Sequence, residues 1–182
     1  MNSVFKADRP RCILLLFLSI MTASASARAR QDQGAPTRVD TLSVAREYMQ
    51  AVRYCALITV DSTGQPHVRT MDPFPPDESM VVWLGTNRQS RKVAEIRRNP
   101  RVALYYSDEK GVGYVAIMGK ACLVDDAKEK AVRWKEEWKA FYPDRQASYI
   151  LIKVIPEKLE IVNYKHRIFA GTATWQPPSV KF

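Results

Sequence analysis

From residue 54 to residue 164 the sequence repeats one pattern, in which short apolar or alternating runs are separated by turn residues. Short runs rich in valine, isoleucine and aromatic residues are typical of β-strands, and polar turns between them favour hairpins. The runs are YCALITVD, PHVRTMD, SMVVWLGT, RVALYYSD, YVAIMGKACLVDD, ASYILIKVIP and KLEIVNY. About six to seven strands predict a mainly β (α+β) fold that closes as a barrel.

Three other segments carry apolar residues at helical spacing. The first follows Asp40 or Thr41, either of which suits the cap position, and the second stops at the Asn-Pro pair of residues 99–100. The sequence therefore predicts short helices that flank the barrel, over residues 41–52, 89–98 and 127–142.

The third of these helices opens with Asp126 and Glu129 at capping-box spacing. Its helical periodicity places Trp134, Trp138 and Phe141 on one face. Such a face predicts a contact with the core or with a second subunit, and less readily a wall of a flavin or substrate site.

The N-terminus has the order of features found in export signals. Lys6, Arg9 and Arg11 precede the apolar run CILLLFLSIM, and the small residues of ASASARA follow it. The apolar run is about ten residues long, whereas a membrane-spanning helix needs roughly 20. We expect cleavage near Ala27, a periplasmic or secreted mature protein and no stable membrane insertion after cleavage.

Cleavage removes three bases and one acid, so that the formal net charge falls from +9 to +7. The remaining chain is long enough for one core, and nothing in it indicates a second domain. A basic chain can bind nucleic acid, but an exported protein meets little of it, so we predict no nucleic-acid partner. The predicted organisation is a signal peptide at 1–27, a flexible leader at 28–40, one domain at 41–164 and a C-terminal tail at 165–182.

Cysteine and histidine are too sparse to indicate a metal site. Cys55 and Cys122 lie in strand-like runs, where both a disulfide permitted by export and two buried free thiols are compatible with the sequence. His67 and His166 stand at no metal-ligand spacing from these cysteines. We therefore predict no metal.

Three cations, Arg88, Arg91 and Lys92, stand where the second helix is expected to begin. A helix N-terminus is itself positive, and each exposed cation there costs on the order of 0.3–1 kcal/mol. An anion removes that cost, because free backbone N–H groups, the hydroxyls of Thr86 and Ser90 and the basic side chains can converge on one phosphate. A solvated basic surface explains the charges equally well, so the residues alone leave both interpretations open.

Three segments occur in order along the chain: TGQPHVRTM (63–71), WLGTNRQSRKVAEIRRNPRVALYY (83–106) and YVAIMGKACLVDD (114–126). Together they resemble the pyridoxamine 5'-phosphate oxidase-like family, most closely its short general stress protein branch. The resemblance covers roughly residues 43–164. It implies a split β-barrel that binds FMN, and a homodimer with the flavin at the subunit interface.

The resemblance also implies which residues hold the cofactor. Arg69 is expected beside the flavin and its ribityl chain, with backbone contacts from its neighbours Val68, Thr70 and Met71. The segment after the third strand is expected to cradle the phosphate through Thr86, Asn87, Ser90, Arg91 and Lys92.

The chain also departs from the family pattern. Tyr114 stands where the oxidases present a glutamine to the flavin, and Trp175 in the tail is a candidate to pack beside the ring. The C-terminal substrate-binding segment of those oxidases has no counterpart here. The resemblance therefore implies flavin binding without implying conversion of pyridoxamine phosphate, and it assigns no catalytic residue.

We expect an FMN-dependent oxidoreductase acting on an unidentified small molecule. One alternative is a flavin- or haem-binding protein with little turnover, in which His166 is the candidate haem ligand. Another is a deazaflavin-dependent reductase that shares the barrel, although the expected phosphate cradle favours FMN.

Overall fold

The structure is a computed structural model that describes residues 37–107, 110–111 and 113–182, apart from the side chains of Val39 and Asp40. The predicted signal peptide and most of the predicted leader lie outside the described residues.

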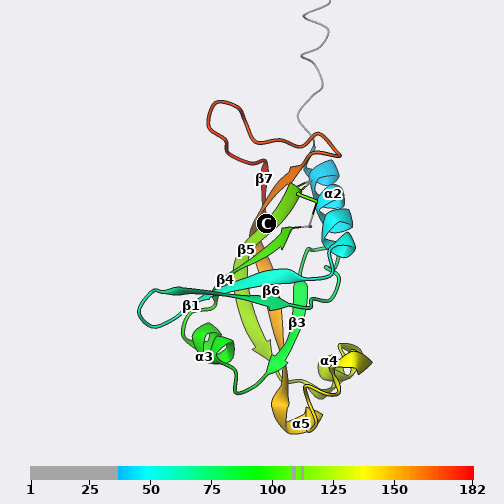
Figure 1. Cartoon of the computed structure of the whole chain (residues 1–182), viewed down its shortest axis with the longest axis vertical. Coiled ribbons are helices and arrows are strands. Elements are labelled where there is room, and N and C mark those ends of the chain that lie inside the picture. Colours follow the sequence, from blue (N-terminus) through cyan, green and yellow to red (C-terminus); the bar gives the residue numbers. More distant parts are fainter. Residues whose placement is uncertain (1–36, 108–109, 112) are drawn as a thin grey trace, which may run out of the picture. The chain divides into compact units, whose positions relative to one another are not determined.

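The strand-like runs form one antiparallel sheet (Figure 1). The strands are β1 (Cys55–Val60), β2 (Pro66–Met71), β3 (Val82–Asn87), β4 (Arg101–Ser107), β5 (Gly113–Val124), β6 (Tyr149–Asn163) and β7 (Ser179–Lys181). Their order in the sheet is β2–β1–β4–β5–β6–β3, and β7 also pairs with β6. The predicted mainly β (α+β), split-barrel fold of about six to seven strands with short helices is confirmed.

The hairpin of β1 and β2 closes on a turn that the sequence specifies. The Asp61 carboxylate accepts the backbone N–H of Thr63 at 2.8 Å, and Gly64 has a φ of 88°, which favours glycine. The resulting register places Arg69 opposite Leu57, diagonally across from Thr59. Residues on the same face at diagonal positions are within reach of long side chains, so the turn sets where Arg69 can point.

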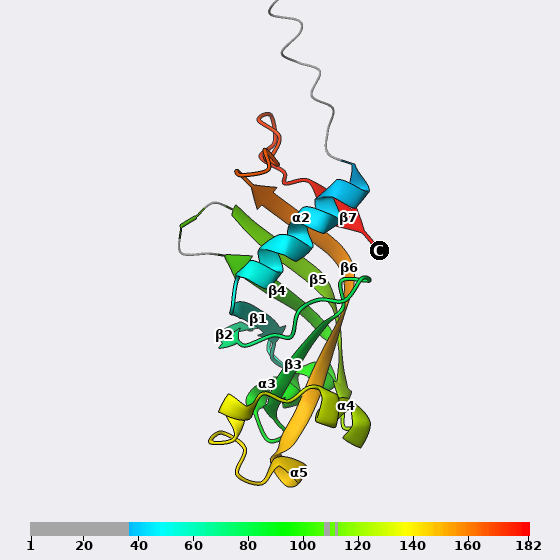
Figure 2. The same ribbon diagram turned by 90° about the vertical axis from the view of Figure 1, so that its right-hand side faces the viewer.

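The helices are short, as predicted. They are α2 (Arg38–Ala51), α3 (Arg91–Arg98), α4 (Ala127–Val132) and α5 (Arg145–Ser148). Helix α2 lies diagonally across one face of the sheet and packs on β5 and β7 (Figure 2). It begins three residues earlier than predicted, so Thr41 is not its cap; instead the Thr41 hydroxyl donates to the Thr37 carbonyl one turn back, at 2.9 Å.

The main core lies between this helix and the inner face of the sheet. Strands that alternate buried and half-buried residues place one side chain in two on this face. Fully buried members from the helix and the strands include Ala45, Leu57, Leu84, Leu104, Val115, Ile117, Leu159 and Ile161.

The prediction of two closing strands was wrong, because β6 is a single strand that runs through Pro156. The register against β5 shifts between Met118 and Gly119, opposite this proline. A proline cannot donate to the ladder, and a bulge accommodates the missing hydrogen bond without ending the strand. At Gly119 a Cβ atom would lie 2.2 Å from the Ile155 carbonyl oxygen, so the close approach requires glycine.

The predicted helix over residues 127–142 was also wrong in its second half. Helix α4 ends at Val132, and a single 3₁₀ turn over Glu136–Trp138 follows. Trp134 and Tyr142 pack edge-on against Tyr149 of β6, with ring centroids 5.3 and 5.1 Å away. These rings form a second core, and the free energy gained by packing them exceeds the modest free energy that a longer helix would contribute.

The C-terminal residues, predicted as a tail, contribute the strand β7, which pairs with Lys158–Glu160 of β6. Cys55 is a buried free thiol and Cys122 an exposed one. Among the described helices none has the length and apolar character needed to span a membrane.

Candidate functional site

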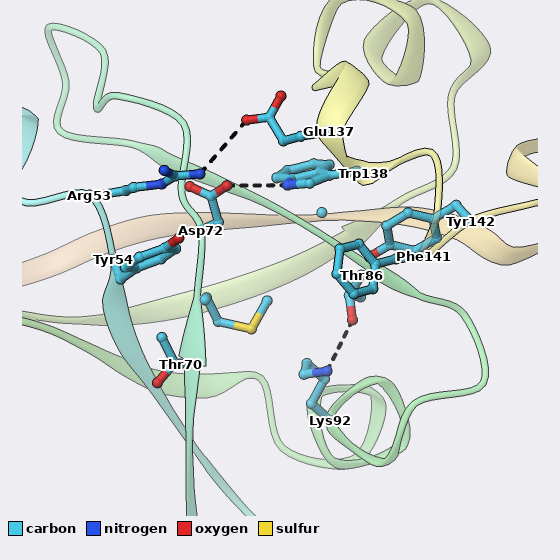
Figure 3. Close-up of a pocket in the computed structure, with 12 residues that line it drawn as sticks. Arg53, Tyr54, Thr70, Asp72, Thr86, Lys92, Glu137, Trp138, Phe141 and Tyr142 are labelled. Atoms are coloured by element: carbon cyan, nitrogen blue, oxygen red, sulfur yellow. Dashed lines mark hydrogen bonds and ion pairs between the residues drawn. The ribbon is translucent and has the colours of Figure 1, made fainter.

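A cavity of about 490 Å³ opens beside β3, within the size range of small-molecule sites. It has a polar end, which includes Thr86 of β3 and Lys92 of α3, and an aromatic end, which includes Trp138 and Tyr142. Figure 3 shows that these two ends come from different parts of the chain, the helix α3 and the segment that follows α4. Thr70 and Met71, at the end of β2, also line it.

The polar end is a small cluster of hydroxyls around one ammonium group. Lys92 Nζ donates to Thr86 Oγ1 at 3.1 Å (Figure 3). Thr86 Oγ1 also lies 3.3 Å from Ser90 Oγ. Burial lowers the pKa of Lys92, and the nearby charge of Arg69 lowers it further. Within the described structure no carboxylate lies at ion-pair distance from this ammonium group. An anionic ligand can supply the missing charge.

The first turn of α3 favours an anion for a second reason. Ser90 occupies the N-cap position, but its side chain makes no capping hydrogen bond, and the first turn contains no acidic residue. The backbone N–H groups of Arg91 and Lys92 are therefore available, since the first residues of a helix have no intrahelical acceptor. Free N–H groups, the helix dipole and a hydroxyl together make an anion site.

A buried carboxylate, which the sequence analysis missed, lies behind this turn. Glu95 Oε2 accepts from Arg69 Nη2 at 2.9 Å, and Glu95 Oε1 lies 3.1 Å from Arg91 Nε. Arg69 Nη1 also donates to Thr59 Oγ1 at 2.5 Å, and the Thr59 hydroxyl in turn bonds Glu95. The only signal in the sequence was the spacing of four between Arg91 and Glu95, which ordinary helix charge pairs share.

The carboxylate of Glu95 is ionised despite its burial. Burial alone would raise its pKa, but the hydrogen bonds from Thr59 and Arg69, together with the charges of Arg69 and His67, outweigh burial and lower the pKa. Arg69 and Arg91 are thus held by an internal anion, whereas Lys92 is held only by a hydroxyl.

The third cation of the predicted cluster points elsewhere. Arg88 Nη2 bonds Asp125 Oδ2 at 2.6 Å, and Arg88 Nε donates to the Ala147 carbonyl at 3.1 Å. Arg88 does not line the cavity. Its charge is neutralised by the protein, and its contacts join the turn before α3 to the segments around α4 and α5.

The aromatic end rests on a glycine. A Cβ atom at Gly85 would lie 2.5 Å from Trp138 and 2.7 Å from Tyr149, so these rings reach the backbone of β3 only because the side chain is absent. The Trp138 indole N–H donates to Asp72 Oδ2 at 3.2 Å, and Lys135 Nζ donates to Asp72 Oδ1 at 2.7 Å. Trp138 is buried as predicted, but Phe141 is exposed at the cavity mouth.

Of the residues named from the sequence, Thr70, Met71, Thr86 and Lys92 line the cavity. The residues that do not line it are Arg69, Asn87, Ser90, Arg91, Tyr114 and Trp175. Asn87 closes the turn before α3 by accepting the Gln89 N–H at 2.8 Å. Tyr114 stacks on Tyr105 with centroids 5.4 Å apart, and Trp175 is 77% exposed in the C-terminal segment. Neither Tyr114 nor Trp175 lines the cavity of this chain. Among the described residues there is also no group of three potential metal ligands.

The chain thus combines an antiparallel split barrel with a basic helix start beside an aromatic wall. The model of the family described as pyridoxamine 5'-phosphate oxidase like matches residues 40–170. The chain therefore belongs to the pyridoxamine 5'-phosphate oxidase-like family. No curated protein matches its sequence.

Several solved structures share the fold of this chain. General stress protein 26 from Bacillus anthracis superposes with a TM-score of 0.62 at 24% identity, over 77% of this chain and 97% of that one. A protein related to general stress protein 26 from Clostridium acetobutylicum gives 0.64 at 19% identity, over 78% and 94%. A pyridoxamine 5'-phosphate oxidase-related, FMN binding protein from Nostoc punctiforme gives 0.58 at 15% identity, over 82% and 98%. At these identities the likeness concerns the fold.

Proposed function

We propose that the chain binds FMN in this cavity and acts as an FMN-dependent oxidoreductase on a small molecule. The observation that carries the proposal is the pairing, in one cavity, of an aromatic end with an ammonium and hydroxyl end that lacks an anion. A flat ring system that bears a terminal phosphate matches both ends. Family membership and the FMN-binding relative support the same ligand.

The donor set at the polar end fits a phosphate. Lys92 supplies a point charge, and Arg91 supplies further N–H donors. Thr86 and Ser90 supply hydroxyls and the first turn of α3 supplies backbone N–H groups. Thr70, Met71 and Trp138 also line the cavity and would contact the ring system.

In this proposal the flavin supplies reversible electron or hydride transfer, and the chain supplies binding and orientation. The carboxylates at the cavity are already engaged: Asp72 accepts from Lys135 and Trp138, and Glu137 faces Arg53 at 4.0 Å. We therefore assign no acid or base, and the substrate remains a small oxidisable or reducible compound.

We also propose a homodimer, because the outer face of the sheet is apolar and uncovered in this chain. Val68 is 66% exposed on β2 and Tyr105 is 41% exposed on β4, and half-buried Ile58 and Ala103 complete two neighbouring rows of this face. A contiguous exposed apolar patch is typical of an interaction surface. Tyr114 lies on this same face, beside Tyr105, so a partner subunit would cover it.

The mature protein is further proposed to be periplasmic or secreted, on the strength of the N-terminal sequence pattern. Expression of the full chain followed by cell fractionation tests this separately from cofactor binding. Recovery of an uncleaved protein from the cytoplasm would contradict it.

The decisive test of the function is a titration of the purified protein with FMN, followed by flavin fluorescence. We expect saturable binding, and reduction of the bound flavin by a nicotinamide or another small donor. A protein that binds no FMN contradicts the whole proposal, whereas FMN binding without turnover with any donor favours the binding-protein alternative. Light scattering at the same protein concentration reports whether the chain is a dimer.

A further inference from the structure

Glu95 is the one acidic side chain that is buried in the described structure, and its polar neighbours are a threonine, two arginines and a histidine. Its side chain is 4% exposed, and it meets Thr59 and Arg69 through one oxygen. Its other oxygen lies 3.1 Å from Arg91 Nε and 3.8 Å from His67 Nε2. A buried charge persists only when it is paired and hydrogen-bonded, so Glu95 and its partners form one unit.

Glu95 and Thr59 contact only some of the N–H donors of each arginine. Arg91 meets Glu95 through Nε, which leaves its two terminal nitrogens for another acceptor. Arg69 uses one N–H of each terminal nitrogen for Thr59 and Glu95. A guanidinium group is planar and rigid, so holding one edge sets the direction of the others.

The exposure of the side chains increases from Glu95 through Arg69 to Arg91. Glu95 is 4% exposed, Arg69 is 17% exposed and Arg91 is 67% exposed. The Glu95 carboxylate is thus enclosed, whereas the Arg91 guanidinium group reaches solvent at the start of α3. Arg91 precedes Lys92, which lines the cavity. The unit also joins three elements, because Thr59 is on β1, Arg69 on β2 and Glu95 on α3.

We propose that Glu95 is the positioning residue of the anion site, holding Arg69 and Arg91 in the orientation that receives a phosphate monoester. This inference rests on the proposed FMN function and adds a residue that acts through the two arginines without touching the ligand. Two effects oppose each other at this position. The negative charge of Glu95 disfavours a nearby anion, whereas its hydrogen bond from Arg69 and its ion pair with Arg91 orient the cations. Orientation dominates, because the two guanidinium groups largely neutralise the carboxylate before the ligand arrives.

The test compares FMN with riboflavin, which has the same ring system and lacks the phosphate. In Glu95→Gln the side chain keeps its size but loses its charge and one acceptor oxygen. We expect FMN affinity to fall about tenfold, the lower end of the range seen when a residue that orients a direct ligand is changed. Riboflavin affinity should stay within about twofold, because a defect confined to the phosphate end does not reach the ring.

Glu129→Gln is the matched control. Glu129 also forms an ion pair with an arginine four residues away, but on α4, and it does not line the cavity. It should leave both affinities unchanged. If Glu95→Gln does not fold, Thr59→Val removes only the hydroxyl that bridges Arg69 and Glu95. It should produce a smaller loss in the same direction, with a melting temperature that shows the variant to be folded.

The possible outcomes distinguish the role of Glu95 from the proposed FMN function. Selective loss of FMN binding supports it. Equal losses for FMN and riboflavin would mean that Glu95 is merely structural, and tighter FMN binding would mean that it only opposes the anion; either result overturns the inference and leaves the FMN function standing. A wild-type protein that binds neither flavin overturns both.

Discussion

The two ends of the cavity differ in how complete they are without a ligand. At the aromatic end Asp72 and Trp138 are paired within the protein: Asp72 accepts from both Lys135 and Trp138, and Trp138 also packs edge-on against Phe74 at 5.6 Å. At the polar end Lys92 is half-buried next to hydroxyls and other cations, with burial and Arg69 both lowering its pKa.

This difference shows which part of the site the fold builds for itself. The aromatic end belongs to a packed second core, so its geometry follows from folding alone. The polar end carries an electrostatic penalty in the absence of an anion, and a ligand that binds there relieves it. A change at the polar end should therefore affect binding more than stability, and a change at the aromatic end should do the reverse.

The strongest test of this contrast is the double change Arg91→Ala and Lys92→Ala. Each charge-assisted hydrogen bond contributes about 1.5–3 kcal/mol, so FMN affinity should fall at least about a hundredfold. The free energy of unfolding should change by less than about 1 kcal/mol, because the loss of the exposed Arg91 partner of Glu95 offsets the removal of two cations from a helix N-terminus. Fluorescence titration and urea unfolding measure the two quantities.

The matched control for that experiment is Arg97→Ala with Arg98→Ala, which removes two exposed cations from the last turn of the same helix. It should leave FMN affinity within about twofold at moderate salt, because exposed charges beyond a Debye length of about 8 Å are largely screened. An equal loss of affinity in the control would mean that the basic surface attracts FMN without a defined site.

The converse test is Gly85→Ala at the aromatic end. The added Cβ would lie 2.5 Å from Trp138, and inserting a methyl group into a packed core costs about 1–3 kcal/mol. Urea unfolding should show this loss, and the affinities for FMN and riboflavin should fall together. Gly171→Ala is the control, since its Cβ would meet only Thr174, at 3.9 Å. Unchanged stability in Gly85→Ala would mean that the aromatic cluster repacks freely.

The same contrast explains what the sequence could and could not predict. Strands were predicted correctly where turn residues and an alternating apolar pattern indicate the same structure, as in the hairpin closed by Asp61 and Gly64. The segment over residues 127–142 failed because its aromatic residues have helical spacing and yet pack on Tyr149 of a distant strand. Local periodicity carries no information about such a partner.

At the polar end the sequence predicted the residues that are close along the chain but not their distant partners. Thr86, Ser90 and Lys92 are neighbours along the chain, so their convergence follows from one strand, one turn and one helix. Glu95 was missed because its importance depends on Arg69 and Thr59, which the hairpin brings from elsewhere in the sequence. Arg88 was grouped with the site by proximity in sequence, but its partner Asp125 directly follows β5.

Acid unfolding provides a smaller test, centred on Glu95. Its pKa is lowered in the folded state, so its contribution to stability is full above the unfolded pKa of about 4.3 and is lost as the pH falls through the folded value. Glu95→Gln should therefore be less stable than wild type at pH 7, by about 1–3 kcal/mol. The difference should shrink as the pH falls below about 4.3, and it should vanish once the pH lies below the folded value. A difference that stays constant with pH would show that the pKa of Glu95 is the same in the folded and unfolded states.

The smallest effect is expected for Ser90→Ala, and it separates capping from ligand binding. An N-cap serine usually contributes about 1 kcal/mol through its hydrogen bond to the first turn. Here the Ser90 side chain makes no such bond, because Val93 N–H bonds the Ser90 carbonyl at 3.0 Å and Ser90 Oγ lies near Thr86. Urea unfolding should thus show a loss below about 0.5 kcal/mol. FMN affinity should fall severalfold, consistent with one hydrogen bond of about 1 kcal/mol. A full capping loss with unchanged FMN affinity would place Ser90 in the helix and outside the anion site, and the polar end would then consist of Lys92, Arg91 and Thr86.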